Sequence, residues 1–189
     1  GGLRDVLLGR GEEAPAGLRA QVPVNIRRVD REGRLGNELT SLFVELPVDE
    51  PDALRRFERV RDRARELKRG SQRTGGKAIV DITNMGPPLF GALLARAMFG
   101  GSRMFNLTIT NIPGPQEELS AFGAPLLEAL PFVPLFSDHV FGIAIASYNG
   151  RMVFGLTADA VSGADVDVLA AGIERSLAEL EAAAATRHP

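Results

Sequence analysis

Apolar and polar residues alternate most clearly over residues 105–110. One face of this segment is apolar and the other carries β-branched threonines: the apolar residues are Phe105, Leu107 and Ile109, and the threonines are Thr108 and Thr110. A period of two with β-branched residues is typical of a strand with one buried face. The pattern therefore predicts a strand over 105–110.

The residues after Thr110 cannot all continue that strand. Pro113 and Pro115 lack the N–H that a strand ladder needs and restrict the residues before them, and Gly114 permits a backbone approach that a Cβ would block. We therefore expect a rigid loop. Such a loop can hold a ligand in a fixed geometry, and it is also an ordinary way to end a strand.

Further strands are predicted on both sides of this segment. Residues 19–27 and 38–46 have strand-like patterns, the second ended by Pro47, and 78–82 is a short apolar stretch. Near the C-terminus, 141–148 and 152–157 flank Asn149-Gly150, a pair that favours the positive backbone angles of a type I′ hairpin turn.

Helical spacing of apolar residues predicts three helices, over 51–69, about 88–99 and 163–183. Pro51 suits a first helical turn, and Ser162, with Asp165 three residues on, is the expected cap of the last helix. The apolar helix at 88–99 is expected in the core or along an acyl channel. Together the elements predict an α/β domain with a mixed β-sheet flanked by helices.

The helix at 51–69 is locally positive. Its basic residues outnumber its acidic ones; they are Arg55, Arg56, Arg59, Arg61, Arg63, Arg65, Lys68 and Arg69 against Asp52, Glu58, Asp62 and Glu66. This pattern indicates either a solvated face with ion pairs along the helix or a surface that attracts anionic lipid or phosphate. Residues 70–77 are expected to form a flexible connection, because Gly76 and Ala78 break the phosphate-binding loop pattern.

Composition excludes several classes of function. A net charge of -2 and a pI near 5.8 argue against nucleic-acid binding. The chain has no cysteine and only two, widely separated, histidines, so no disulfide and no metal site are expected. No run approaches the roughly 18 apolar residues of a membrane span. We expect a cytoplasmic protein, compatible with peripheral contact at a membrane or lipid droplet.

The string TNIPGP at 110–115, the apolar stretch with Pro131 and Pro134, and DHVFGIAIASYNGRMVFGLTAD at 138–159 resemble the C-terminal part of the wax ester synthase/diacylglycerol acyltransferase family. The resemblance extends upstream to 22–27 and 36–37, so it covers nearly the whole chain, 1–189. It implies one lobe of a chloramphenicol acetyltransferase-like two-lobe fold. It also implies transfer of an acyl group from acyl-CoA, as a substrate and without a further cofactor, to a lipid alcohol or diacylglycerol.

That family uses a histidine from an HHxxxDG motif, which this chain lacks; neither His139 nor His188 has the required context. Residues 3–8 also read as the end of a helix with no cap before it. We therefore expect a fragment, with the catalytic N-terminal lobe of the same protein as its partner. No catalytic residue is assigned, because His139 has no nucleophile in a recognisable elbow nearby.

The resemblance places the substrate-binding residues in the strand-to-loop segment: Thr110, Asn111, Ile112, Pro113, Gly114 and Pro115. Asn111 can donate and accept hydrogen bonds at once, either closing the loop or orienting a substrate carbonyl. Two other functions stay open. The chain could be an interaction module without catalysis, or part of an acyltransferase whose donor is bound to an acidic carrier protein that docks on the basic helix.

Overall fold

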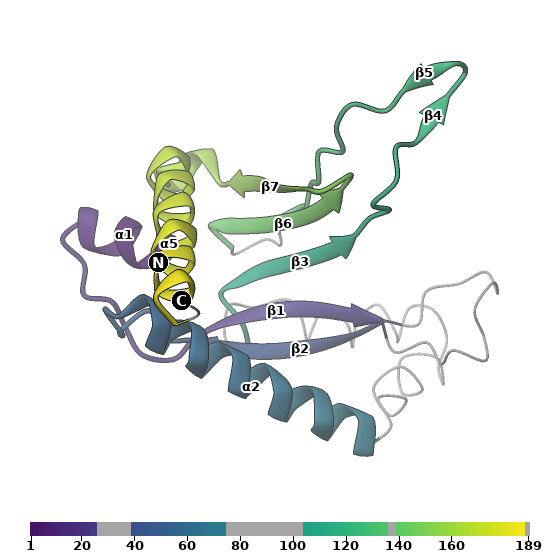
Figure 1. Ribbon diagram of the computed structural model, residues 1–189. Coiled ribbons are helices and arrows are strands. Elements are labelled where there is room, and N and C mark those ends of the chain that lie inside the picture. Colours follow the sequence, from purple (N-terminus) through teal and green to yellow (C-terminus); the bar gives the residue numbers. More distant parts are fainter. Residues whose placement is uncertain (26–38, 75–103, 136–138, 188–189) are drawn as a thin grey trace, which may run out of the picture.

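A five-stranded mixed sheet in the order β2-β1-β3-β6-β7 forms the centre of the molecule (Figure 1). The computed structural model describes residues 1–25, 39–74, 104–135 and 139–187. The strands are β1 (Leu18–Asn25), β2 (Leu39–Leu46), β3 (Leu107–Pro113), β6 (Phe141–Tyr148) and β7 (Arg151–Ala158). The predicted fold class and these predicted strands are confirmed.

The two outer pairs of the sheet are antiparallel, and the centre is parallel. β1 pairs with β2 along its whole length, from Leu18↔Leu46 to Asn25↔Leu39. β6 and β7 form the predicted hairpin, with both turn residues at positive φ, 46° for Asn149 and 75° for Gly150. β3 lies parallel to both β1 and β6. Segments far apart in the sequence thus form one sheet.

The junction of β1 with β3 is short, since only Ala20↔Leu107 and Gln21↔Thr108 pair there. A polar chain crosses the sheet at this point: Thr108 Oγ1 donates to Gln21 Oε1 at 3.2 Å, and Gln21 Nε2 donates to Ser41 Oγ at 2.9 Å. Gln21 and Thr108 are buried. A buried chain with satisfied partners favours one register of the strands over its neighbours.

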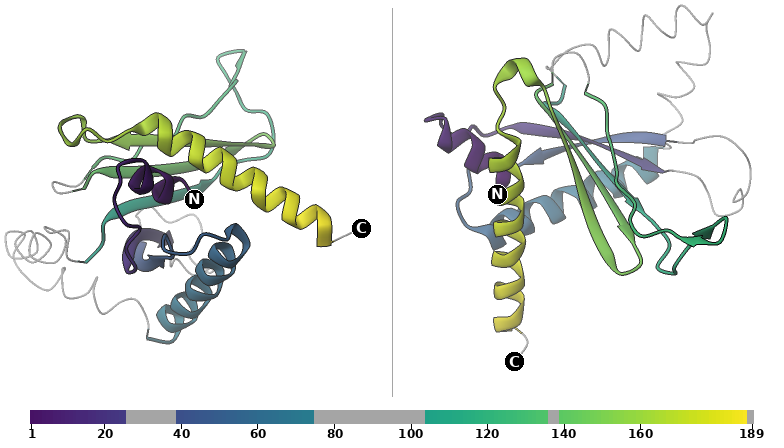
Figure 2. Two further views of the ribbon diagram at one scale, coloured as in Figure 1. Left: turned by 90° about the vertical axis from the view of Figure 1, so that its left-hand side faces the viewer. Right: turned by 90° about the horizontal axis from the view of Figure 1, so that it is seen from above.

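Helices α1 (Gly2–Gly9) and α5 (Val166–Arg187) lie side by side over one face of the sheet (Figure 2). Their apolar stripes meet the sheet in a core of buried side chains: Val6, Ala20, Leu107, Phe141, Ile143 and Leu169. Burial of such side chains is the main favourable term in folding. Helix α2 (Ala53–Thr74) lies beside β2 and is joined to α5 by the Arg56–Glu179 ion pair at 3.6 Å.

Three boundaries differ from the sequence-based expectation. β3 continues to Pro113 instead of ending at Thr110. Pro113 is tolerated because β1 has already diverged from β3 by then, so no neighbour on that side requires its N–H. Helix α2 runs to Thr74, so Gly70 is helical and not part of a loop. The start of the last helix also differs.

Ser162 does not cap α5. It ends a short 3₁₀ turn, η2 (Ala160–Ser162), whose own cap is the Asp159 carboxylate. Gly163 then adopts a left-handed conformation with φ of 64°, which interrupts the helix, and Asp165 Oδ1 accepts from the Val168 N–H at 3.0 Å. The predicted helix at 88–99, the stretch at 78–82 and the loop end at Lys77 lie outside the described residues.

Candidate functional site

The segment 110–115 lies at the carboxyl end of β3, where β3 pairs with β6 from Thr108↔Gly142 to Pro113↔Ser147. Successive side chains of a strand point to opposite faces. Asn111 therefore shares the face of Ile109, which packs against the core, whereas Thr110 shares the opposite face. Asn111 and Ile112 are exposed. One face of the sheet can present the side chain of either Thr110 or Asn111, but not both.

Gly114 packs directly against β6. Its N–H donates to the Ser147 carbonyl at 2.9 Å and lies 3.3 Å from Ser147 Oγ. A Cβ at position 114 would come within 2.2 Å of the Ser147 carbonyl oxygen, which is backbone and cannot rotate away. The close approach that the sequence indicates at Gly114 is thus a contact between β6 and the loop.

The loop after β3 is fixed to the hairpin turn of β6 and β7. The Asn149 N–H donates to the Pro115 carbonyl at 3.1 Å. Gln116 continues this contact: its Oε1 accepts from the Gly150 N–H at 3.0 Å, and its Nε2 donates to the Gly114 carbonyl, also at 3.0 Å. These bonds give the rigid connection that two prolines and a glycine predict.

The chain then leaves the sheet in a projecting segment, residues 116–135, which we call the apolar arm (Figure 1). It carries two short paired strands, β4 (Ser120–Ala121) and β5 (Ala124–Pro125). The base of the arm is closed by Tyr148, whose buried hydroxyl donates to the Leu126 carbonyl at 2.9 Å and accepts from the Leu119 N–H at 2.8 Å. The arm is therefore held at its base by the sheet.

Large apolar side chains of the arm face solvent. Phe122, at the tip, is fully exposed, and the others that are exposed are Leu119, Leu126, Leu127, Leu130 and Phe132. Ile112, at the end of β3, adds to this surface. The arm carries Glu117, Glu118 and Glu128 but no lysine or arginine. An exposed apolar surface of this extent is typical of a site that another surface covers.

The returning end of the arm crosses the sheet face opposite α1 and α5. A Cβ at Gly155 in β7 would come within 1.9 Å of the Pro131 carbonyl oxygen. Gly155 pairs with Ala144 in β6, so a residue without a side chain lets the arm lie on these strands. A cavity of about 420 Å³ lies between the arm and the hairpin turn, lined by Glu118, Pro125, Leu126, Leu127, Tyr148, Asn149 and Arg151. None of residues 110–115 lines it.

His139 lies in the interior. Its ring is stacked on Phe105 with centroids 4.5 Å apart, and its Nε2 lies 2.9 Å from the Phe105 carbonyl oxygen. The side chain is only 5% exposed. These contacts are those of a polar residue built into the core, in agreement with leaving His139 out of the catalytic residues.

The basic residues of α2 form ion pairs along the helix and with its neighbours. Within the helix, Arg61 and Arg65 both approach Asp62, and Arg63 pairs with Glu66. The Asp62 pKa is lowered by its hydrogen bond with Arg61. Exposed pairs of this kind contribute little stability, typically below about 1 kcal/mol. The helix is thus the ion-paired face that the sequence suggests, and it remains positive overall.

Metal and membrane features can be judged for the described part of the chain. Within it, no three histidine, aspartate or glutamate side chains come close enough together to hold a metal ion. No helix there has the length and apolar character needed to span a bilayer.

Sequence reasoning located the strand-to-loop segment but missed the apolar arm. The signal was available in part, because residues 119–135 are rich in leucine, phenylalanine and proline without a helical or strand period. Apolar residues are ordinarily assigned to a core, so their exposure could not be read from composition.

Comparisons with known proteins now add to this geometry. A family model described as "WS/DGAT C-terminal domain" matches residues 35–181. The "Probable diacyglycerol O-acyltransferase tgs1" of Mycobacterium tuberculosis is 33% identical over 95% of this chain and 39% of its own length. The "O-acyltransferase WSD" of Acinetobacter baylyi is 28% identical over 84% of this chain and 34% of its own length.

A solved structure has the same fold. The wax ester synthase/diacylglycerol acyltransferase from Marinobacter aquaeolei superposes with a TM-score of 0.74 over 97% of this chain and 41% of that chain, at 23% identity. This chain thus spans about two fifths of the length of these relatives, 39% for the mycobacterial protein.

Proposed function

Because this chain belongs to the WS/DGAT C-terminal domain family, we propose that it is the C-terminal lobe of an acyl-CoA-dependent O-acyltransferase. The products would be wax esters from long-chain alcohols or triacylglycerol from diacylglycerol. The family match, supported by relatives named as O-acyltransferases, carries this proposal. Acyl-CoA acts as a substrate, and no further cofactor is invoked.

In this proposal the lobe completes a substrate tunnel and does not carry the base. The chain contains no HHxxxDG motif, and His139 is held in the core by Phe105. A histidine on the other lobe would take the proton of the acceptor hydroxyl while its oxygen attacks the acyl thioester, releasing the ester and free coenzyme A. General-base help of this kind contributes about 10² to 10⁴ in rate. The chain alone is therefore expected to be inactive.

Residues Thr110–Pro115 are proposed to line the tunnel from the C-terminal side. Their place at the end of a strand, fixed by hydrogen bonds to Ser147 and to the hairpin turn, gives the rigidity that substrate positioning needs. Asn111 is exposed there and supplies a polar contact. The apolar arm extends from the same end of the sheet, so the covering surface is proposed to be the other lobe.

The experiment uses the complete protein, with both lobes. Purified complete protein should release coenzyme A from palmitoyl-CoA when hexadecanol or diacylglycerol is added, and this chain alone should not. Asn111→Ala in the complete protein should lower kcat/KM and leave the fold intact. Turnover by this chain alone that is abolished by His139→Ala would refute the division of labour. A complete protein with no transfer to either acceptor would favour a non-catalytic interaction module.

A further inference from the structure

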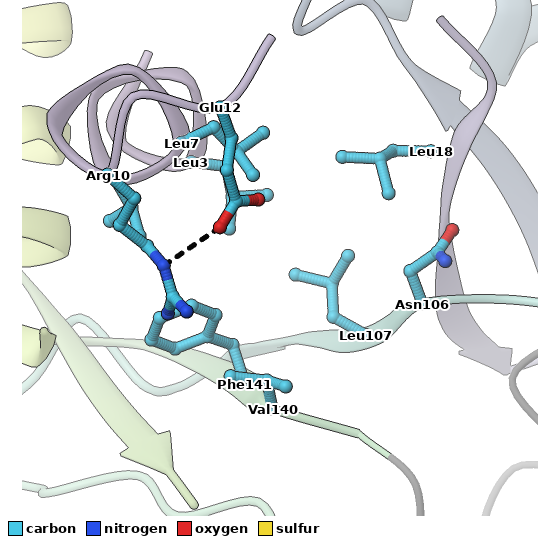
Figure 3. A pocket seen from close by; sticks show the side chains of 10 residues that line it. Leu3, Leu7, Arg10, Glu12, Leu18, Asn106, Leu107, Val140 and Phe141 are labelled. Atoms are coloured by element: carbon cyan, nitrogen blue, oxygen red, sulfur yellow. Dashed lines mark ion pairs between the residues drawn. The ribbon is translucent and has the colours of Figure 1, made fainter. Parts of the chain in front are cut away.

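A second cavity, of about 320 Å³, lies at the opposite end of the sheet from the proposed tunnel (Figure 3). Its walls come from α1 and from the first residues of β1, β3 and β6. Most of the lining is apolar: Leu3, Val6, Leu7, Leu18, Leu107, Val140 and Phe141. Leu107 begins β3, whereas Asn111 follows four residues later, about 13 Å along the strand. The cavity is therefore separate from the segment 110–115.

The polar groups at the cavity are held in place by the end of α1. The Gly11 N–H donates to the Leu8 carbonyl at 3.0 Å, and the Glu12 N–H donates to the Leu7 carbonyl at 2.9 Å. With Gly11 at φ of 73°, these bonds form a Schellman motif. The motif places the Arg10 and Glu12 side chains together, with Arg10 Nε 2.9 Å from Glu12 Oε1, both about half exposed (Figure 3).

The Arg10–Glu12 pair offers donors and acceptors side by side with no net charge. A carboxylate ligand would be attracted by Arg10 but repelled by Glu12. A hydroxyl, in contrast, accepts from a guanidinium and donates to a carboxylate at once. The pair therefore suits a neutral hydroxyl head better than an acid.

The volume limits the chain that can follow the head. If each methylene takes about the 30 Å³ that a liquid water occupies, the cavity accommodates roughly ten carbon atoms. From these observations we propose that the cavity binds a medium-chain aliphatic primary alcohol, its alkyl chain between α1 and the sheet and its hydroxyl on Arg10 and Glu12. This inference goes beyond the proposed acyl transfer and does not depend on it.

Chain length provides the first test. Binding of 1-hexanol, 1-octanol, 1-decanol and 1-dodecanol to this chain is followed by NMR shifts of α1 and the start of β3. Each added methylene should tighten binding by about fourfold until the cavity is full, and the gain should stop near ten carbons. Continued tightening past twelve carbons, or shifts confined to the apolar arm, would overturn the assignment.

Filling the cavity provides a matched control. Leu7 lines the cavity, whereas Leu8, the next residue of α1, is 48% exposed and does not. Leu7→Trp should weaken 1-octanol binding by at least about tenfold, and Leu8→Trp should leave it unchanged. Leu18→Phe fills the cavity from the opposite wall and serves if Leu7→Trp does not fold. Equal affinity in all folded variants would exclude this cavity as the site.

The head group is tested by exchanging charges. Wild type should bind 1-octanol more tightly than octanoate. Glu12→Gln removes the repulsive charge and leaves Arg10, so the order should invert, with octanoate gaining about tenfold or more. Octanoate binding wild type better than 1-octanol would refute the alcohol assignment. Because these variants lie away from residues 110–115 and binding is measured without turnover, failure here leaves the acyltransferase proposal standing, and the reverse also holds.

Discussion

Replacing Gly114 with alanine distinguishes a structural glycine from one that only admits a substrate. The new Cβ would be 2.2 Å from the Ser147 carbonyl oxygen, so the loop must move away from β6. Overpacking of this kind costs about 1–3 kcal/mol. The Gly114 N–H bond to the Ser147 carbonyl would be weakened or lost, adding about 1 kcal/mol.

The expected loss in the free energy of unfolding is therefore about 2–4 kcal/mol. For a chain of this size, each kcal/mol lowers Tm by roughly 2–4 °C, so Gly114→Ala should melt roughly 4–16 °C below wild type. Gly70→Ala is the matched control, because no atom lies within 4 Å of a Cβ there and the residue is helical. That change should be neutral or stabilising by up to about 1 kcal/mol.

Asn111→Ala supplies the functional half of the comparison, because Asn111 is exposed and its removal should change stability by no more than about 0.5 kcal/mol. In the complete protein its kcat/KM should fall by about tenfold or more, as expected for one lost hydrogen bond to substrate. Thermal denaturation and initial rates of coenzyme A release measure the two effects. The reasoning fails if Gly114→Ala melts with wild type, or if Asn111→Ala loses stability and keeps its kinetics.

Other predictions follow from particular contacts. Asp165→Ala should destabilise the domain by about 1 kcal/mol in urea unfolding, and Ser162→Ala by clearly less, because Asp165 caps α5; equal losses would contradict this. Tyr148→Phe removes two hydrogen bonds from the base of the apolar arm and should cost about 1–3 kcal/mol, with faster amide exchange at Leu119; unchanged exchange would mean that the arm is held elsewhere. The isolated chain should aggregate at high concentration, and Phe122→Ser should reduce this by light scattering; monodisperse wild type would show that the exposed arm does not drive self-association.

Local patterns in the sequence were enough to predict most of the described elements. The alternation over 105–110 and the Asn149-Gly150 turn fix the backbone through side-chain period and allowed φ angles, which depend on few neighbours. The segment 110–115 was likewise found from its prolines and glycine. Which surfaces each of its side chains meets depends on pairing with β6, a strand more than 30 residues away along the chain.

The failures arise where tertiary contacts decide between local alternatives. Asp159, Ser162 and Asp165 are all good cap residues, and the left-handed Gly163 decides that the helix starts after Asp165. Pro113 stays in β3 because its other neighbour has diverged, a fact of sheet geometry and not of sequence. The apolar arm was missed because its side chains break the expectation that leucine and phenylalanine are buried.

The short seam between β1 and β3 has a consequence for how the domain folds. Each hairpin at the edges of the sheet can form from neighbouring residues, but the seam brings Gln21 to Thr108 across 87 residues of chain. Closure of a loop of that length must precede the two residue pairs and the few hydrogen bonds that reward it, which slows folding. We expect both hairpins to form early and the seam to be rate-limiting. Conservative changes at Thr108 should therefore slow refolding more than equally destabilising changes in the outer hairpins.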